Sequence, residues 1–558
     1  MKQTFSSVLL KHYHETPEKI ALTLLHAGEG DVPVSYGELV ERSSAFSAAL
    51  EAAGIQPGEV VILIQQHGLD LVNAYFGVIL HGAIPSIMPF LTEKLLPERY
   101  RAGMKSLVSI SKPAAIITYA DFEDEVRSAL IEGDSVRAVI VAEEVSGDAL
   151  VDLEALGGLQ RAPQDVVLLQ HSSGSTGLQK GVALSHQAVF NQLASYQLAL
   201  ALQEEDVIVS WLPLYHDMGL IAGFLMPLLS GIPLVLMSPF DWVRAPYRLM
   251  QAVSKYKGTL SWLPNFAYNF CAKKVRDRHL ADVDLSSWRA VINCSEPMRW
   301  DSQQAFLDRF QDFGFREEAL ATCYAMAENV FAVTQGGITA PVKYDDIDRE
   351  IFQTEGKAVA AMDGKPSLRM VSAGKPIRNV EVKIVTAVGE ALPERQVGEI
   401  ALRSDCMLTG YFHREDITEE AFIDGWFLTG DYGYLADGEV YISGRKKDLI
   451  IVGGKNVYPQ DIEEIVNGVP GVHPGRVVAF GVFNEDAGTE EVAVVAEIDD
   501  PADKDQVADA VRKAVAHGSA VVLRYVHLVD GQWLVKTSSG KIARSANKDK
   551  FLAEITPS

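Results

Sequence analysis

Apolar and polar positions alternate along the first 400 residues in two periods, one typical of helices and one typical of strands. Residues 35–53 carry apolar side chains at helical spacing, which predicts an amphipathic helix. Residues 69–80 show the same period, whereas residues 60–64, 114–118 and 138–141 are short apolar runs of the kind that form buried strands. Helices that alternate with apolar strands predict an α/β fold built in layers.

One apolar stretch is long enough to raise the question of a membrane span. Residues 219–237 run for 19 positions without a charge, close to the ~20 that an α-helix needs to cross a bilayer. However, Pro227, a Ser-Gly pair and Pro233 interrupt the stretch, and such residues end helices and form turns. We therefore expect a buried helix, a turn and a core strand over residues 234–237, and no transmembrane segment.

The pattern changes toward the C-terminus. Residues 389–442 contain short strands separated by Gly, Asp and Pro, and a charged GRKKD string follows. The last hundred residues carry their own strands, at 477–480 and 492–498, and a helix at 505–515. We therefore expect a large N-terminal domain of layered sheets and helices with a small β-rich subdomain, and a small α+β C-terminal domain. The expected boundaries are 1–443 for the first, 444–448 for a hinge and 449–558 for the second.

Composition narrows the class of partner. The 558 residues are 48% hydrophobic and carry a formal charge of −24. That charge disfavours binding to nucleic acids, which requires a basic face, and docking on anionic membranes. The four cysteines contain no CxxC pair, so they give no zinc or disulfide pattern and suit the reducing cytoplasm.

Candidate chemistry begins at residues 168–182, which read LLQHSSGSTGLQKGV. An apolar strand runs into a loop of small residues that Lys180 closes. Backbone N–H groups of such a loop can converge on phosphate oxygens, and its hydroxyls add donors. The loop is not a Walker A sequence, because Gln179 and Gly181 flank the lysine. A simple linker remains the alternative. The candidate phosphate ligands are Ser172, Ser173, Gly174, Ser175, Thr176, Gly177 and Lys180.

Two aromatic strings offer a substrate pocket. Residues 210–220 read SWLPLYHDMGL and residues 261–268 read SWLPNFAY. Neither string supplies an obvious buried acid for an amino group, which argues against an amino-acid substrate. The alternative for the first string is a strand and a turn, with Asp217 capping the next helix. The candidate pocket residues are Trp211, Tyr215, His216, Asn265 and Phe266.

Several further strings could bind a nucleotide. In CYAMAEN, residues 323–329, Tyr324 could stack on a purine and Glu328 could hold Mg²⁺. Asp431 in WFLTGD could accept ribose hydroxyls, and Arg445 could reach the same ribose or a phosphate. Lys541 follows a Ser/Gly turn and could stabilise charge at phosphorus. Capping and solvated surface charges are the ordinary alternatives for all of them. The candidate residues lining the slot from either side are Ser295, Glu296, Pro297, Ala325 and Met326.

Taken together, these strings resemble the ordered core motifs of the adenylate-forming superfamily, from about residue 20 to residue 545. The resemblance implies ATP and Mg²⁺ as cofactors, with adenine between Tyr324 and the 293–297 loop. It also implies a C-terminal domain that rotates about Lys447 between adenylate formation and thioester formation. The catalytic residues that it implies are Lys541, Glu328 and His216.

Within the superfamily, SWLPLYHDMGL, LMSPFDW, PNFAYNFC, LSSW and YPQDIE look most like fatty acyl-AMP ligases. These enzymes pass fatty acids to an acyl carrier protein, here expected to be a separate chain. The connection between Glu328 and Gly374 is long compared with that of CoA ligases. It resembles the insertion of acyl-AMP ligases that hinders the domain rotation needed for transfer to CoA. The string VGGKNVYP, residues 452–459, is more similar to CoA ligases, so a fatty acyl-CoA ligase remains the alternative. An inactive nucleotide- and lipid-binding homologue is less favoured, because Glu328, Asp431, Arg445 and Lys541 are all present.

Overall fold

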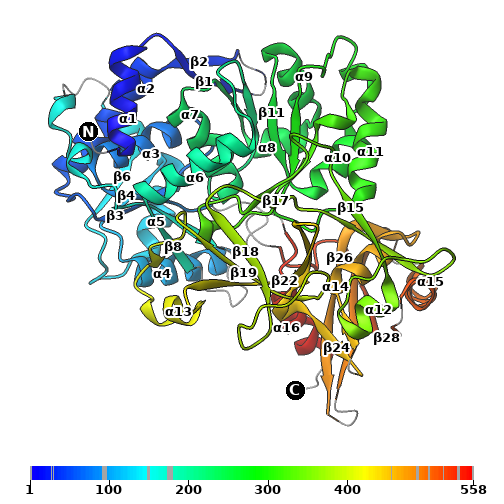
Figure 1. The fold of residues 1–558 in the computed structure, drawn as a ribbon. Coiled ribbons are helices and arrows are strands. Elements are labelled where there is room, and N and C mark those ends of the chain that lie inside the picture. Colours follow the sequence, from blue (N-terminus) through cyan, green and yellow to red (C-terminus); the bar gives the residue numbers. More distant parts are fainter. Residues whose placement is uncertain are drawn as a thin grey trace. The chain divides into compact units, whose positions relative to one another are not determined.

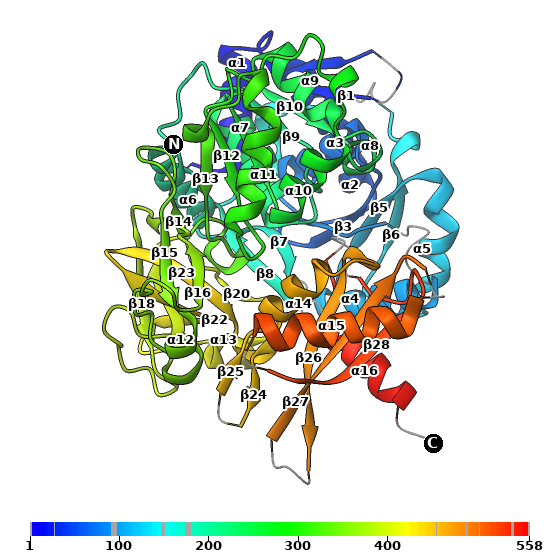
Figure 2. The ribbon, with the colours of Figure 1, turned by 90° about the vertical axis from the view of Figure 1, so that its right-hand side faces the viewer.

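The computed structural model of the protein describes residues 3–26, 28, 30–90, 97–146, 151–172, 180–453, 455–485, 489–500, 503–519, 521–536 and 541–555. The chain forms two compact units, which Figures 1 and 2 show in two views. Unit 1 comprises Met1–Val342, Pro376–Val380 and Arg403–Ala421. Unit 2 comprises Lys343–Lys375, Glu381–Leu402 and Phe422–Ser558. The domain and hinge boundaries at residues 443–449 stay predictions.

The first sheet of unit 1 has seven strands in the order β13-β12-β11-β9-β10-β1-β2. Every neighbouring pair is parallel except β1 with β2. Parallel strands bring their carboxyl ends to one edge, so the loops after β9, β10, β11, β12 and β13 gather there. The strands are β1 (Ile20–Leu25), β2 (Val32–Ser35), β9 (Ile208–Ser210), β10 (Leu234–Met237), β11 (Leu260–Leu263), β12 (Ala290–Asn293) and β13 (Leu320–Thr322).

The second sheet of unit 1 has the order β20-β8-β7-β4-β3-β5-β6. Strands β7, β8 and β20 pair antiparallel, and the others pair parallel. Strand β3 is buried at every position, as its apolar run predicts. The strands are β3 (Val60–Ile64), β4 (Ile84–Ile87), β5 (Ala115–Thr118), β6 (Ala138–Val141), β7 (Val166–Ser172), β8 (Lys180–Ser185) and β20 (Gly410–Tyr411).

Helices supply the crossovers between these strands. The predicted helix at 35–53 is α2, and a capping box starts it: the Ser35 hydroxyl accepts from the Glu38 amide at 3.2 Å, and Glu38 accepts from the Ser35 amide at 3.0 Å. Helices α1, α2 and α3 pack on one another (Figure 1). The helices of unit 1 are α1 (Phe5–Glu15), α2 (Tyr36–Ala52), α3 (Leu69–His81), α4 (Pro97–Ser111), α5 (Glu123–Ala129), α6 (His186–Ala199), α7 (Met226–Ser230), α8 (Pro239–Arg244), α9 (Tyr247–Tyr256), α10 (Asn265–Lys274), α11 (Trp300–Phe310) and α13 (Glu415–Glu420).

The uncharged stretch at 219–237 folds as expected from its turn residues. A buried π-helix over Met218–Leu225 continues into α7, which ends at Gly231 with φ 73°, and β10 follows. The expected helix, turn and core strand are therefore confirmed. Throughout the described part of the chain, every helix is too short or too polar to cross a bilayer.

Unit 2 is built from smaller sheets. Strands β18, β19, β22 and β21 form one sheet, with β23 paired to β22, and β26-β27-β28 form another. The predicted strands at 477–480 and 492–498 lie within β26 and β27, and the predicted helix at 505–515 lies within α15. The strands are β15 (Tyr344–Asp348), β16 (Ser367–Val371), β18 (Val380–Val385), β19 (Gly398–Ser404), β21 (Phe422–Ile423), β22 (Trp426–Ala436), β23 (Glu439–Arg445), β24 (Ile450–Val452), β25 (Lys455–Val457), β26 (Val472–Asn484), β27 (Thr489–Ile498) and β28 (Leu523–Val529). The helices are α12 (Arg349–Glu355), α14 (Pro459–Asn467), α15 (Lys504–Gly518) and α16 (Arg544–Ile555).

Candidate functional site

The candidate residues of unit 1 come from the carboxyl ends of neighbouring strands. Trp211 directly follows β9, Asn265 and Phe266 follow β11, the 295–297 loop follows β12, and Tyr324 follows β13. The order β13-β12-β11-β9 makes these strands neighbours. Ligands of open α/β sheets bind at such an edge, so the fold brings the predicted slot and pocket residues to one side of the sheet.

The phosphate loop connects β7 to β8. The strands pair so that Ser172 lies opposite Lys180, at the base of the loop. The Lys180 Nζ lies 4.7 Å from the centroid of the Tyr411 ring, within the range of a cation–π contact. The predicted ligands Ser173, Gly174, Ser175, Thr176 and Gly177, and the side chain of Ser172, lie outside the described residues.

Tyr411 links this lysine to the predicted metal ligand. The Tyr411 hydroxyl donates to Glu328 Oε1 at 2.8 Å. Burial and the adjacent Glu328 carboxylate raise the pKa of Tyr411, so the phenol stays a proton donor at neutral pH. The Leu408 amide also donates to the Glu328 carbonyl oxygen at 2.8 Å. Lys180, Tyr411 and Glu328 therefore form one continuous set of contacts.

The turn that follows Glu328 is strained. Val330 has φ 63° and ψ −56°, a region that β-branched residues rarely adopt. The Phe331 amide closes the turn by donating to the Asn329 carbonyl oxygen at 2.7 Å. The side-chain Nδ2 of Asn329 donates to the Ala332 carbonyl oxygen at 2.7 Å. These bonds hold the strained turn and with it the backbone that presents Glu328.

Polar contacts join the loops after β11 and β12. The Asn293 side chain donates to Asn265 Oδ1 at 3.0 Å, and the Arg299 amide donates to the same oxygen at 3.0 Å. The Phe266 amide donates to Glu296 Oε2 at 2.9 Å. Hydrogen bonds therefore join two of the predicted pocket residues, Asn265 and Phe266, to one wall of the predicted slot.

The other wall is a tight hairpin after β13. The Tyr324 amide donates to Thr334 Oγ1 at 3.1 Å, and the Met326 amide donates to the Phe331 carbonyl oxygen at 2.8 Å. Ala325 pairs with Ala332 across this hairpin. The β12 and β13 register sets Asn293 beside Thr322, so the two loops predicted to hold a base start from adjacent positions.

The pocket string 210–220 contains the predicted helix cap, whereas the pocket role of Tyr215 and His216 stays a prediction. Asp217 caps the following helix by accepting from the Met218 amide at 2.8 Å, which confirms the capping interpretation. The Tyr215 and His216 rings meet edge to face, with centroids 5.0 Å apart. Burial raises the pKa of Tyr215 to about 12, so this phenol is neutral at physiological pH.

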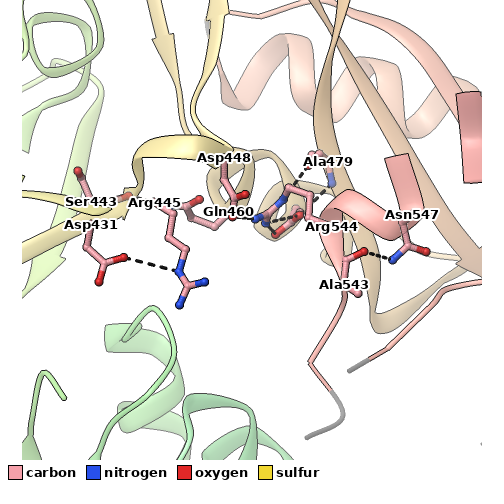
Figure 3. Close-up of polar contacts among 10 residues, drawn as sticks. Asp431, Ser443, Arg445, Asp448, Gln460, Ala479, Ala543, Arg544 and Asn547 are labelled. Carbon is pink, nitrogen blue, oxygen red and sulfur yellow. Dashed lines mark hydrogen bonds and ion pairs between the residues drawn. The ribbon is translucent and has the colours of Figure 1, made fainter. Parts of the chain in front are cut away.

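Unit 2 brings the predicted ribose residues together. Strands β22 and β23 pair with Asp431 opposite Arg445, and Arg445 Nε lies 3.6 Å from Asp431 Oδ1 (Figure 3). The neighbouring Lys446 is held away by Glu399, 2.7 Å from its Nζ, and this contact raises the pKa of Lys446. Arg445 and Lys447 are exposed on either side of it. The pair can therefore offer a carboxylate and a guanidinium to a ligand, as a ribose site requires.

Lys541 stands on a segment whose base is rigid. Asn547 is fully buried, and its side chain accepts from the Val535 amide at 2.8 Å and donates to the Ala543 carbonyl oxygen at 2.8 Å. Arg544 forms an ion pair with Asp448 at 2.5 Å (Figure 3). It also donates to Glu463 at 2.8 Å. Lys541 itself is exposed. The arrangement anchors both ends of the segment and leaves the lysine at the surface of unit 2.

Replacing Arg544 by alanine is expected to destabilise unit 2. The Arg544 side chain is 22% exposed, and its partners Asp448 and Glu463 are 21% and 17% exposed. Removing the guanidinium leaves two largely buried carboxylates unpaired, which costs roughly 3 kcal/mol. The measurement is urea unfolding of the full chain. Arg512→Ala is the matched control, since its pair with Asp509 is surface-exposed. Equal losses in the two variants would contradict the assignment.

Sequence patterns did not reveal Tyr411 or Arg544. Tyr411 meets Glu328 because β20 pairs with β8 across more than 200 residues of chain, and no local pattern signals such a pairing. Arg544 lies at the end of the predicted Lys541 string, but its acidic partners lie 81 and 96 residues upstream. Both residues position predicted site residues.

The Glu328 side chain fits a magnesium ion that is bound together with phosphates. Within the residues that the structure describes, no three His, Cys, Asp or Glu side chains group into a metal site. Mg²⁺ commonly uses one or two carboxylates together with substrate phosphates and water. Glu328, beside Lys180 through Tyr411, has the chemistry for that arrangement.

Comparisons with known proteins identify the family and the fold that this chain is similar to. Residues 9–412 match the family model described as AMP-binding enzyme. The chain is 31% identical to the medium-chain fatty acid–[acyl-carrier-protein] ligase JamA of Moorena producens, over 98% of this chain and 95% of JamA. Among solved structures, the chain resembles one described in a study of fatty acyl-adenylate ligases from E. coli and L. pneumophila. The TM-score is 0.89 and the identity is 27%, over 99% of this chain and 98% of the other. A L. pneumophila fatty acyl-adenylate ligase in complex with acyl adenylate and pyrophosphate gives TM-score 0.75, 29% identity and coverage of 98% and 96%.

Proposed function

Because the chain belongs to the family of AMP-binding enzymes, we propose that it activates a medium- or long-chain fatty acid with ATP and passes the acyl group to the phosphopantetheine thiol of a separate acyl carrier protein. The contacts that carry this proposal run from Lys180 through Tyr411 to Glu328. They link Lys180, where the predicted phosphate loop ends, to the carboxylate suited to Mg²⁺. The four cysteines are free and buried, which suits the reducing cytoplasm as the location.

The first step in this proposal is attack of the fatty carboxylate on the α-phosphorus of ATP, with release of pyrophosphate. The carboxylate is ionised at neutral pH and needs no general base. The chain's own task is therefore to position the reactants and to neutralise charge. Lys180 and the loop hold the phosphates, Asp431 and Arg445 hold ribose, and Lys541 stabilises charge at phosphorus. Mg²⁺ held by Glu328 would neutralise phosphate charge.

Contacts of the segment between Glu328 and Gly374 support a carrier protein as the acceptor. Within unit 2, helix α12 of this segment packs against the region predicted to rotate. The Phe352 and Tyr458 rings lie 5.7 Å apart, and Arg349 donates to the Gly518 carbonyl oxygen. Both side chains hold the segment to the C-terminal part of the chain. We propose that such a clamp restricts the rotation to the arrangement that accepts the carrier thiol and opposes the further rotation that transfer to CoA needs.

The first glycine in VGGKNVYP, Gly453, is weaker support for a CoA ligase than the string implies. Strands β24 and β25 pair so that Val452 lies opposite Lys455, and two residues connect them. Gly453 has φ 56°, and two-residue hairpin turns favour glycine for that reason. The turn geometry alone therefore accounts for Gly453. A fatty acyl-CoA ligase remains the second candidate.

The deciding experiment measures acid-dependent pyrophosphate release over a series of fatty acids, followed by product analysis. Fatty acids are expected to stimulate release, and a phosphopantetheinylated carrier is expected to be acylated in preference to CoA. Release with an amino acid but with no fatty acid would contradict the substrate class. If none of the acids stimulated pyrophosphate release, the inactive homologue would be favoured. Efficient formation of acyl-CoA would favour the second candidate.

A further inference from the structure

Three aromatic side chains meet at the carboxyl edge of three adjacent parallel strands. Trp211 follows β9, Trp242 lies in α8 after β10, and Phe266 lies in α10 after β11. Strand β9 is hydrogen-bonded to β10 on one side and to β11 on the other. The cluster therefore lies on the same edge as the candidate pocket, and Phe266 is bonded through its amide to Glu296.

The two indoles stack face to face. Their ring centroids lie 3.5 Å apart, and the ring planes differ by 7°. Phe266 meets both rings edge-on, at 6.4 Å from Trp211 and 6.1 Å from Trp242, and Phe270 lies 5.4 Å from Trp242. Trp211 is 4% exposed and Trp242 is 0% exposed, whereas Phe266 is 43% exposed. The stack is thus fixed by its neighbours, and the cluster reaches the surface through Phe266.

Among the residues that the structure describes, neither buried indole N–H group finds an acceptor. Neither Trp211 Nε1 nor Trp242 Nε1 has a hydrogen-bond partner in the described structure. Other tryptophans of this chain do find one. Trp262 donates to the Tyr196 hydroxyl at 2.8 Å, and Trp288 donates to Ser261 Oγ at 3.1 Å. Buried polar groups are nearly always satisfied, and an orphan donor is costly. A phenylalanine at either position would bring ring area without that cost.

We propose that these two indoles bind an oxygen atom carried by the acyl chain, and that the preferred substrate is therefore a hydroxy- or oxo-substituted fatty acid. An indole N–H group would donate to the hydroxyl or keto oxygen, and the aromatic cluster would supply apolar surface beside it. An unsubstituted chain would leave these donors unsatisfied. The inference rests on the proposed function, because it assigns the substrate class of that same pocket.

The size of the preference follows from one hydrogen bond to a buried donor. A site that bonds a substrate oxygen discriminates against the analogue that lacks it, because its polar groups are then left unpaired. One such bond corresponds to about tenfold in kcat/KM. We therefore expect at least one oxygen-substituted isomer to exceed the unsubstituted acid of equal length by about tenfold or more.

The test uses the full chain and acids of one length: dodecanoic acid, its hydroxy isomers and its oxo isomers. Pyrophosphate release gives kcat/KM for each acid. In Trp211→Phe and Trp242→Phe the preference is expected to fall toward one, because the donors are removed while aromatic rings remain. Phe270→Leu is the matched control, since it alters packing on Trp242 without removing a donor, and it is expected to keep the preference.

Two results would overturn the inference while leaving the proposed function standing. One is equal or faster activation of dodecanoic acid compared with every substituted isomer by the unmodified protein, a measurement that needs no variant to fold. The other is an unchanged preference in the protein carrying both tryptophan substitutions. Activation of none of the acids would contradict the proposed function itself, and the inference with it.

Discussion

Replacing Lys541 by alanine is expected to slow pyrophosphate release by about 10²–10³. A preorganised positive charge contributes most where negative charge develops, and the proposed adenylation step places that charge at the α-phosphorus. Lys541 is exposed, and contacts of Asn547 and Arg544 hold the chain that follows it. Removing an exposed side chain leaves these contacts intact, so the loss reports chemistry rather than unfolding.

The second half-reaction separates the possible roles of Lys541. After the predicted rotation, this lysine is away from the site, so Lys541→Ala supplied with preformed acyl-adenylate should still load the carrier thiol. Single-turnover rates for both steps in the same variant make the comparison. Lys513→Ala is the matched control, because Lys513 is an exposed lysine on α15 of the same unit. Equal losses in both steps would assign Lys541 to docking or folding, and no loss would make it a surface charge.

Local sequence patterns predicted the elements of this fold well. The apolar run at 60–64 became β3, and the turn residues within 219–237 correctly divided an uncharged stretch into helix, turn and strand. These features depend on periodicity and on the backbone preferences of Gly and Pro, which act within a few residues. The α/β fold and the resemblance to adenylate-forming enzymes are both confirmed.

Contacts between distant parts of the chain were harder to predict. Tyr411 and Trp242 gain their positions from strand pairing and from packing between loops, so no nearby residue signals them. The predicted roles of Glu328, His216, Asp431, Arg445 and Lys541 stay predictions, although the first of these now has a defined partner in Tyr411. Motifs identified which residue types were available, and the sheet order determined which of them meet.

Loosening the contacts between α12 and the C-terminal part of unit 2 is expected to raise transfer of the acyl group to CoA by about tenfold or more. Phe352 is 1% exposed and belongs to a core with Ile347, Tyr434, Tyr441 and Tyr458. Truncating a buried phenylalanine typically costs about 3–5 kcal/mol of packing. If the contact with Tyr458 restrains rotation, Phe352→Ala or deletion within residues 342–365 weakens that restraint, and CoA gains access to the adenylate.

The measurement is the ratio of acyl-CoA to acyl-carrier product formed from one preparation of acyl-adenylate. Pyrophosphate release by the same variant shows whether the first step, and so the fold, survives. Arg349→Ala removes the bonds to the Gly518 and Ser367 carbonyl oxygens and provides a milder test if Phe352→Ala is poorly folded. Met362→Ala is the matched control, because Met362 lies in the same segment and is 59% exposed. An unchanged ratio in both clamp variants, with release intact, would show that α12 does not select the acceptor, and the carrier preference would then have to reside in contacts with the carrier protein itself.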